Sequence, residues 1–163
     1  MRKNFLIALG IGIVCIALAA VWVVHMQRGA YVDLPGKVLK VRTAPLDEAS
    51  SVAVVDFRVS NPADYPFVVR KVAVAMEDSA GNESEGQTIS ELDARQLFQA
   101  IPLLGQKFND TLLMRDSIPP RSSWDRMVAA RFEVPQARLE ARKRLVVRIE
   151  EVDGKVFDLS ETK

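Results

Sequence analysis

An uninterrupted apolar run near the amino terminus constrains this chain more than any other feature. Phe5 to Val24 reads FLIALGIGIVCIALAAVWVV, twenty residues without a charged side chain. A helix rises about 1.5 Å per residue, so this run would span roughly 30 Å, the thickness of a bilayer's hydrocarbon core. The sequence therefore predicts one transmembrane helix over residues 5–24, with the lipid bilayer as a partner.

The charges that flank this run predict its orientation. Arg2 and Lys3 precede it, and positive residues favour the cytoplasmic side of a membrane. We therefore expect residues 1–4 to be a cytoplasmic tail of a single-pass membrane protein whose carboxy-terminal part is periplasmic or extracellular. A cleaved signal peptide is the alternative, because Ala17-Leu18-Ala19 is a small-residue cleavage pattern. The anchor is preferred because Val21 to Val24 extends the apolar run beyond that site.

Composition limits what the remainder of the chain can do. Residues 25–36 are expected to form a stalk, and residues 37–163 one folded domain. The chain has 22 Lys and Arg against 21 Asp and Glu, and this balance does not favour a nucleic-acid-binding protein. The lone Cys15 and the lone His25 lie in or beside the apolar run. The predicted domain therefore has no thiol or imidazole for catalysis or metal binding.

Short segments of alternating apolar and polar residues predict β-strands. The clearest, Ser51 to Ser60, has Ala53, Val55, Phe57 and Val59 on one face and Asp56, Arg58 and Ser60 on the other. We expect it to pair with the strand predicted over 67–77, across the turn at Asn61-Pro62. The predicted strands cover residues 38–41, 51–60, 67–77, 111–115, 123–134, 145–152 and 155–159.

Other local signals predict the connections. Asp153-Gly154 between two alternating runs is typical of a tight hairpin. Residues 78–86 are polar and contain glycine, which predicts a loop. Residues 90–101 have helical periodicity, with Ser90 and Asp93 as a capping pair. This helix is expected to pack on the sheet, the alternative being a membrane or partner surface. Together these features predict a mainly β fold: an immunoglobulin-like antiparallel β-sandwich of about seven strands with one inserted short helix.

Two blocks of sequence carry a family resemblance. Residues 54–81, VVDFRVSNPADYPFVVRKVAVAMEDSAG, resemble the late-embryogenesis-abundant type 2, or water-stress, domain. Residues 118–159, beginning IPPRSSWDRMVAARFEVP and ending LVVRIEEVDGKVFDL, are similar to the end of bacterial telokin-like immunoglobulin domains of unknown function. The resemblance implies an immunoglobulin-like domain anchored in a bacterial membrane by one helix, with structural motifs and no catalytic signature.

Motifs that would indicate catalysis are missing from the sequence. It contains no glycine-rich phosphate loop and no Gly-x-Ser-x-Gly elbow. We therefore expect no enzyme, no catalytic or cofactor-binding residue and no cofactor. Asp78, Asn82, Glu83 and Glu85 could ligate calcium, but a solvated acidic turn is the preferred interpretation, so no metal site is predicted.

One basic cluster is a candidate binding site. It consists of Arg138, Arg142, Lys143 and Arg144. The cluster is either a solvated link between strands or a surface that binds an anionic ligand or partner.

Two functions follow from these observations. The first is a non-catalytic envelope protein whose domain serves protein–protein interaction or scaffolding, with a stress-related role as a variant. The partner would be another envelope protein. The alternative is a sensor domain that binds an anionic envelope ligand through the basic cluster.

Overall fold

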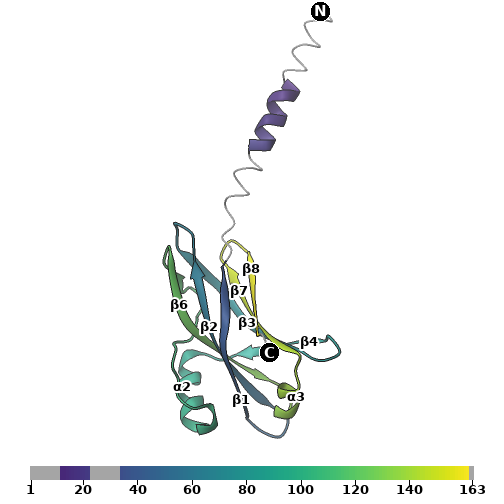
Figure 1. Cartoon of the computed structure of the whole chain (residues 1–163), viewed down its shortest axis with the longest axis vertical. Coiled ribbons are helices and arrows are strands. Elements are labelled where there is room, and N and C mark those ends of the chain that lie inside the picture. The colour runs from purple at the N-terminus through teal and green to yellow at the C-terminus, as the bar shows by residue number, and fades with distance from the viewer. Residues whose placement is uncertain (1–11, 23–33, 162–163) are drawn as a thin grey trace, which may run out of the picture. The chain divides into compact units, whose positions relative to one another are not determined.

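The computed structural model describes residues 12–22 and 34–161 (Figure 1). Residues 12–22 are helical, and residues 34–161 form one compact, mainly β unit. The elements of this unit, in chain order, are β1 (Gly36–Pro45), β2 (Ser51–Asn61), β3 (Phe67–Glu77), β4 (Glu83–Thr88), α2 (Glu91–Ala100), the 3₁₀ helix η1 (Pro102–Leu104), β5 (Ser117–Ile118), β6 (Ser122–Phe132), α3 (Gln136–Glu140), β7 (Arg144–Glu151) and β8 (Val156–Ser160).

The prediction of a membrane-spanning helix over residues 5–24 is wrong for the part of it that the structure describes. Among residues 12–22 and 34–161, no helix is both long and apolar enough to cross a bilayer. Residues 12–22, the part of the apolar run that the structure describes, are helical. This finding also overturns the predicted single-pass topology, whereas the predicted contact with a lipid bilayer stays a prediction. The predicted tail 1–4, and residues 5–11 and 23–24 of the predicted span, lie outside the described residues.

The folded unit begins before residue 37, within the range 25–36 that was predicted to be a stalk. Residues 25–33 lie outside the described part, whereas Leu34 is buried in the core and Gly36 begins β1. The folded unit therefore includes residues before the expected boundary at residue 37.

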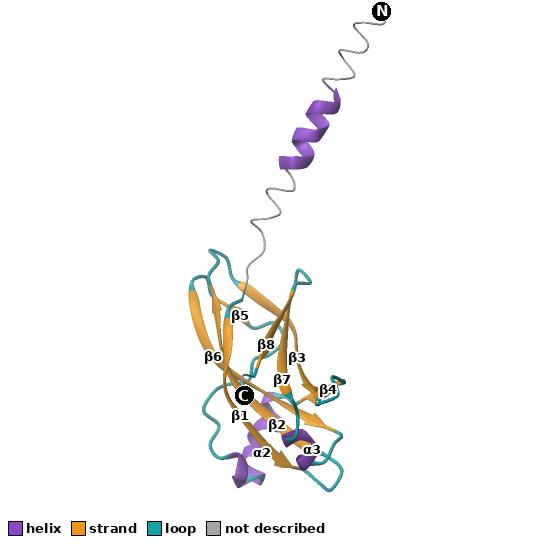
Figure 2. Cartoon of the chain, turned by 45° about the vertical axis from the view of Figure 1, so that its right-hand side comes forward, coloured by secondary structure: helices purple, strands orange, loops and turns teal. Residues whose placement is uncertain are grey.

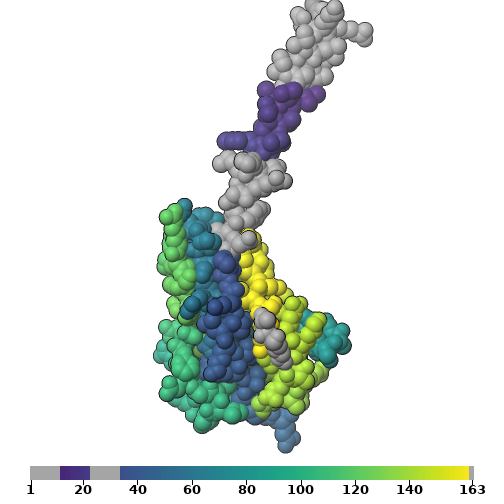
Figure 3. Space-filling model, in the orientation of Figure 1, coloured from purple at the N-terminus to yellow at the C-terminus, as the bar shows by residue number. Residues whose placement is uncertain are grey.

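The predicted sandwich is wrong, because the strands form one curled sheet. Their order is β1-β2-β6-β4-β3-β7-β8, with β5 paired to β3. The sheet curls into a half-barrel (Figure 2). The edge strands β1 and β8 approach each other on one face (Figure 3). There a Cβ on Gly36 would lie 2.8 Å from a methyl carbon of Leu159. A single curled sheet thus encloses the core that two layers were expected to cover.

Strand β4 makes this continuous sheet possible. Its first half pairs with β3, Gly86 opposite Val74, and its end pairs with β6, Gln87 opposite Arg131. The sequence predicted a loop over 78–86, because ESEGQT lacks apolar alternation. The expected pairing of β2 with β3 is also wrong: β2 lies between β1 and β6 in the sheet, and β3 lies between β4 and β7.

Strand β2 is covered on both faces, and this decides where α2 packs. Val55 and Phe57 point into the half-barrel and join the main core. Val52 and Val54 point outward into a second core, which includes Ala94 of α2. Leu97, Phe98 and Ile101 pack against this outer core, so the predicted apolar face of the helix is confirmed. Ser90 is its N-cap, as predicted, and accepts a hydrogen bond from the Asp93 N–H.

Candidate functional site

The predicted basic cluster lies around α3 and the start of β7, and Arg142 is buried there. Its Nε and Nη2 donate to the two carboxylate oxygens of Glu161 at 3.0 and 2.8 Å. Its Nη1 donates to the carbonyl oxygen of Leu139 at 2.9 Å. Arg142 thus ties α3 to the residue that follows β8, which is a structural contact in the folded domain.

The other three members of the cluster also lie beside carboxylates. Lys143 Nζ lies 2.6 Å from Glu77 Oε1, and Arg144 Nε donates to the other oxygen of the same carboxylate. These two hydrogen bonds hold the pKa of Glu77 below its ordinary value. Arg138 Nη2 lies 3.9 Å from Asp78 Oδ2. An anion at this cluster would therefore compete with acidic side chains already in place.

The acidic turn that was considered for calcium has its own contacts. Asp78 accepts hydrogen bonds from the N–H groups of Ala80 and Asn82. Glu83 pairs with Arg148, and Glu85 pairs with Lys71. Within the described ranges, no three His, Cys, Asp or Glu side chains are grouped so that they could hold a metal ion.

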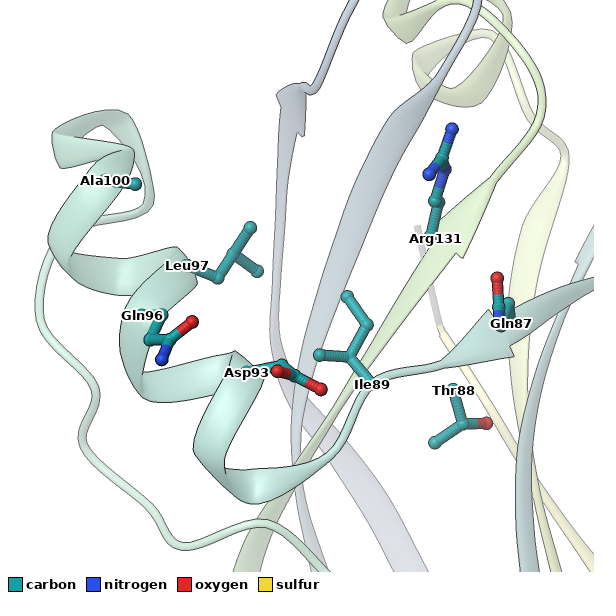
Figure 4. A pocket seen from close by; sticks show the side chains of 8 residues that line it. All are labelled: Gln87, Thr88, Ile89, Asp93, Gln96, Leu97, Ala100 and Arg131. Carbon is teal, nitrogen blue, oxygen red and sulfur yellow. The ribbon is translucent and has the colours of Figure 1, made fainter.

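A pocket of about 400 Å³ lies between α2 and the junction of β4 with β6. The hydrogen bond from Ile89 N–H to Ala129 C=O, 2.8 Å long, fixes the chain between β4 and α2 against β6. Ile89 and Leu97 supply apolar surface, and Gln87 and Gln96 supply amides. Figure 4 shows the residues that line the pocket: Gln87, Thr88, Ile89, Asp93, Gln96, Leu97, Ala100 and Arg131.

A second pocket of about 320 Å³ adjoins the first. It lies where β4 and the end of β6 diverge, and it shares Gln87 and Arg131 with the first pocket. We call the two pockets together the β4–β6 groove. The second pocket is lined by Ser84, Glu85, Gln87, Arg131, Phe132, Glu133 and Val134.

Gly86 permits the crossing of β4 that creates this groove. It is buried, and a Cβ at this position would lie 2.7 to 3.0 Å from three carbon atoms of the Phe132 ring. A side chain here would therefore push β4 away from β6, the strand to which its next residue pairs.

Sequence reasoning did not identify the groove. It predicted a strand over 123–134, which includes Arg131 and Glu133, but it predicted a loop over 78–86, where Glu85 lies, and no strand at Gln87. No motif marks these residues, because the groove exists only where β4 crosses between two distant strands. The lining residues provide apolar contact, amide hydrogen bonds and charge, which suits the binding of a ligand.

Glu91, the first residue of α2, holds the helix to the segment that follows η1. Its carboxylate accepts hydrogen bonds from Thr111 N–H at 3.1 Å and from Arg95 Nε at 2.8 Å, and Lys107 Nζ lies 3.0 Å away. Burial raises the pKa of Glu91, but the hydrogen bonds of Thr111, Lys107 and Arg95 outweigh it and lower the pKa to about 2.

Because the pKa of Glu91 is lowered in the folded state, its stabilising effect is complete above the unfolded pKa of about 4.5 and disappears as the pH falls toward 2. We expect Glu91→Gln to reduce stability at neutral pH by about 1 kcal/mol and to flatten the decrease in Tm across that acid range. Thermal unfolding at several pH values tests this, with exposed Glu48→Gln as the control. Equal acid sensitivity of Glu91→Gln and the unmodified chain would contradict the prediction.

Comparisons with known proteins add little. No protein-family model matches the chain, and no curated protein matches it. An X-ray structure of a Northeast Structural Genomics Consortium target is 12% identical, with 81% of each chain covered and a TM-score of 0.33. A Bordetella pertussis protein provisionally called ApaA is 16% identical over 80% of this chain and 89% of its own, with a TM-score of 0.34. Likenesses this weak carry no argument about fold or function. The resemblance to telokin-like and water-stress domains stays a prediction.

Proposed function

We propose that the domain is a non-catalytic interaction module that binds an extended segment of another protein in the β4–β6 groove. The observation that carries this proposal is that the two pockets are neighbours. They share Gln87 and Arg131, and their lining residues extend from α2 across the end of β4 to Val134. A peptide can occupy both pockets at once, whereas a compact ligand would fill one.

The chemistry of the groove supports a peptide ligand. Gln87 and Gln96 carry amides, each of which both donates and accepts hydrogen bonds, as the peptide group does. Ile89 and Leu97 offer an apolar surface for a side chain of the segment. Extended peptides are commonly bound by this combination of main-chain hydrogen bonds and side-chain pockets.

Selection from a phage-displayed library of short random peptides against the full chain tests the proposal. Ala100→Trp places a bulky side chain at the groove, and Ala137→Trp makes the same change on exposed α3 outside it. We expect Ala100→Trp to weaken the binding of the selected peptides at least about tenfold, equal to about 1.4 kcal/mol. Ala137→Trp should leave their binding unchanged.

Two results would contradict the proposal. Selection could enrich no peptide, or the enriched peptides could bind Ala100→Trp as well as they bind the unmodified chain. Circular dichroism of both variants shows whether the substitutions preserve the β-rich fold, so that lost binding is not confused with unfolding.

The alternative function, binding of an anionic ligand at Arg138, Arg142, Lys143 and Arg144, stays a prediction. It would require the anion to displace Glu77, Asp78 or Glu161 from these cations. The groove is preferred because its space is open, whereas the cations of the cluster lie beside carboxylates.

A further inference from the structure

The charges around the β4–β6 groove are mostly negative. Glu85 and Glu133 line one pocket, and Asp93 lines the other. Arg131 is the one cation among the residues that line either pocket. A segment that enters the groove therefore meets three carboxylates and one guanidinium.

Three of these four groups have partners within the domain. Glu85 pairs with Lys71 at 2.9 Å, and Asp93 accepts a hydrogen bond from the Ser90 hydroxyl at 2.7 Å. Arg131 lies 3.8 Å from Asp47, which partly neutralises it.

Glu133 differs from these groups. Its residue is exposed, and in the described part of the chain no ion pair or side-chain hydrogen bond involves its carboxylate. It directly follows Phe132, the last residue of β6, and both Glu133 and Arg131 line the second pocket. When a segment covers Glu133, the Glu133 carboxylate loses its bound water. A positive group of the segment is then needed to compensate for the lost hydration.

We infer that the groove selects a basic segment, with a Lys or Arg side chain of the partner paired to Glu133. This inference rests on the proposed function, because it specifies the chemistry of the segment bound in the same groove. Charge complementarity of this kind speeds association and excludes acidic competitors. Because Glu133 is exposed, salt should screen the attraction.

Two synthetic peptides of equal length test the inference, one of alternating Lys and Thr and the other of alternating Glu and Thr. We expect the full chain to bind the Lys peptide at least about tenfold more tightly at low salt, and the preference to shrink as salt is added. Glu133→Lys should abolish or reverse it. Asp153→Lys, which makes the same charge change at the β7–β8 turn, should leave the preference in place.

The outcomes separate this inference from the proposed function. Equal binding of both peptides, blocked by Ala100→Trp, would overturn the basic preference and leave the groove as the binding site. If neither Ala100→Trp nor Glu133→Lys changed the binding of the peptides, both proposals would be overturned. An equal effect of Glu133→Lys and Asp153→Lys would show attraction to the overall charge and also overturn the inference.

Discussion

Asp56→Ala is expected to destabilise the folded domain by about 3–5 kcal/mol, because it leaves a buried guanidinium without its carboxylate. Arg42 Nη2 lies 2.6 Å from Asp56 Oδ2, and the two side chains are only 8% and 5% exposed. Asn109 Nδ2 also donates to Asp56, at 2.9 Å. Chemical denaturation of the unmodified chain and of the variant measures the difference in unfolding free energy.

A matched substitution in an exposed ion pair provides the control. Arg58 and Asp125 form a bidentate pair whose side chains are 49% and 37% exposed. Asp125→Ala should therefore cost about 1 kcal/mol or less. Similar losses for Asp125→Ala and Asp56→Ala would contradict our account of the buried pair. The double substitution Arg42→Met with Asp56→Leu should recover much of the loss, since it removes both charges.

The same ion pair should also affect the groove. Arg42 donates to the carbonyl oxygens of Leu104 and Gln106, both at 2.7 Å. Its guanidinium lies 4.9 Å from the Phe98 ring centroid and 5.8 Å from that of Phe108. It thus joins β1 to α2 and to the segment that follows η1. Hydrogen exchange in α2, which forms one wall of the groove, should increase in Asp56→Ala before the strands of the sheet open.

Gly86→Val is expected to destabilise the domain by about 1–3 kcal/mol, because the added side chain meets the Phe132 ring. The close approach involves a ring packed in the core, which has little room to move. Thermal and denaturant unfolding measure the effect. The variant should also no longer bind the peptides that bind the groove, since β4 and β6 would separate there.

Two further variants test the cause of this loss. Exposed Glu85→Val makes a substitution on the same strand without the ring contact, and should change stability by about 0.5 kcal/mol or less. Gly86→Val combined with Phe132→Leu should be less destabilising than the sum of the two single changes, because Leu leaves space for the new side chain. Strict additivity would show that the clash is not the cause.

Local sequence patterns predicted most strands and the main helix. The strand expected over 67–77 matches β3, and the hairpin at Asp153-Gly154 is confirmed by the pairing of β7 with β8. Gly154 has φ of 88°, which this turn requires and which glycine adopts readily. The expected strand over 111–115 is reduced to one bridge, between Thr111 and Met127.

Burial patterns were predicted only in part. Alternation in β2 correctly placed Val55 and Phe57 in the core. It also placed Asp56 on a polar face, yet Asp56 is buried, because α2 and η1 cover the outer face of the sheet and Arg42 neutralises the charge. Alternation shows which residues share a face but does not show what lies against that face.

The basic cluster shows why the candidate site could not be judged from sequence. Lys143 and Arg144 are neighbours in the chain, but Glu77, which binds both, is 66 and 67 residues away. Gln87 and Arg131, which join the two pockets of the groove, are also distant in sequence and opposite each other in the sheet.

The sequence by itself determined the β-rich class, the bounds of most strands, the capped helix and the final hairpin, because these depend on residues a few positions apart. Only the tertiary structure decided the strand order, the single curled sheet and the partner of each charged side chain. Those depend on contacts between distant residues. Of the apolar run over 5–24, the structure describes residues 12–22, which are helical. The groove likewise arises from one strand, β4, whose polar sequence gives no local sign that it bridges β3 and β6.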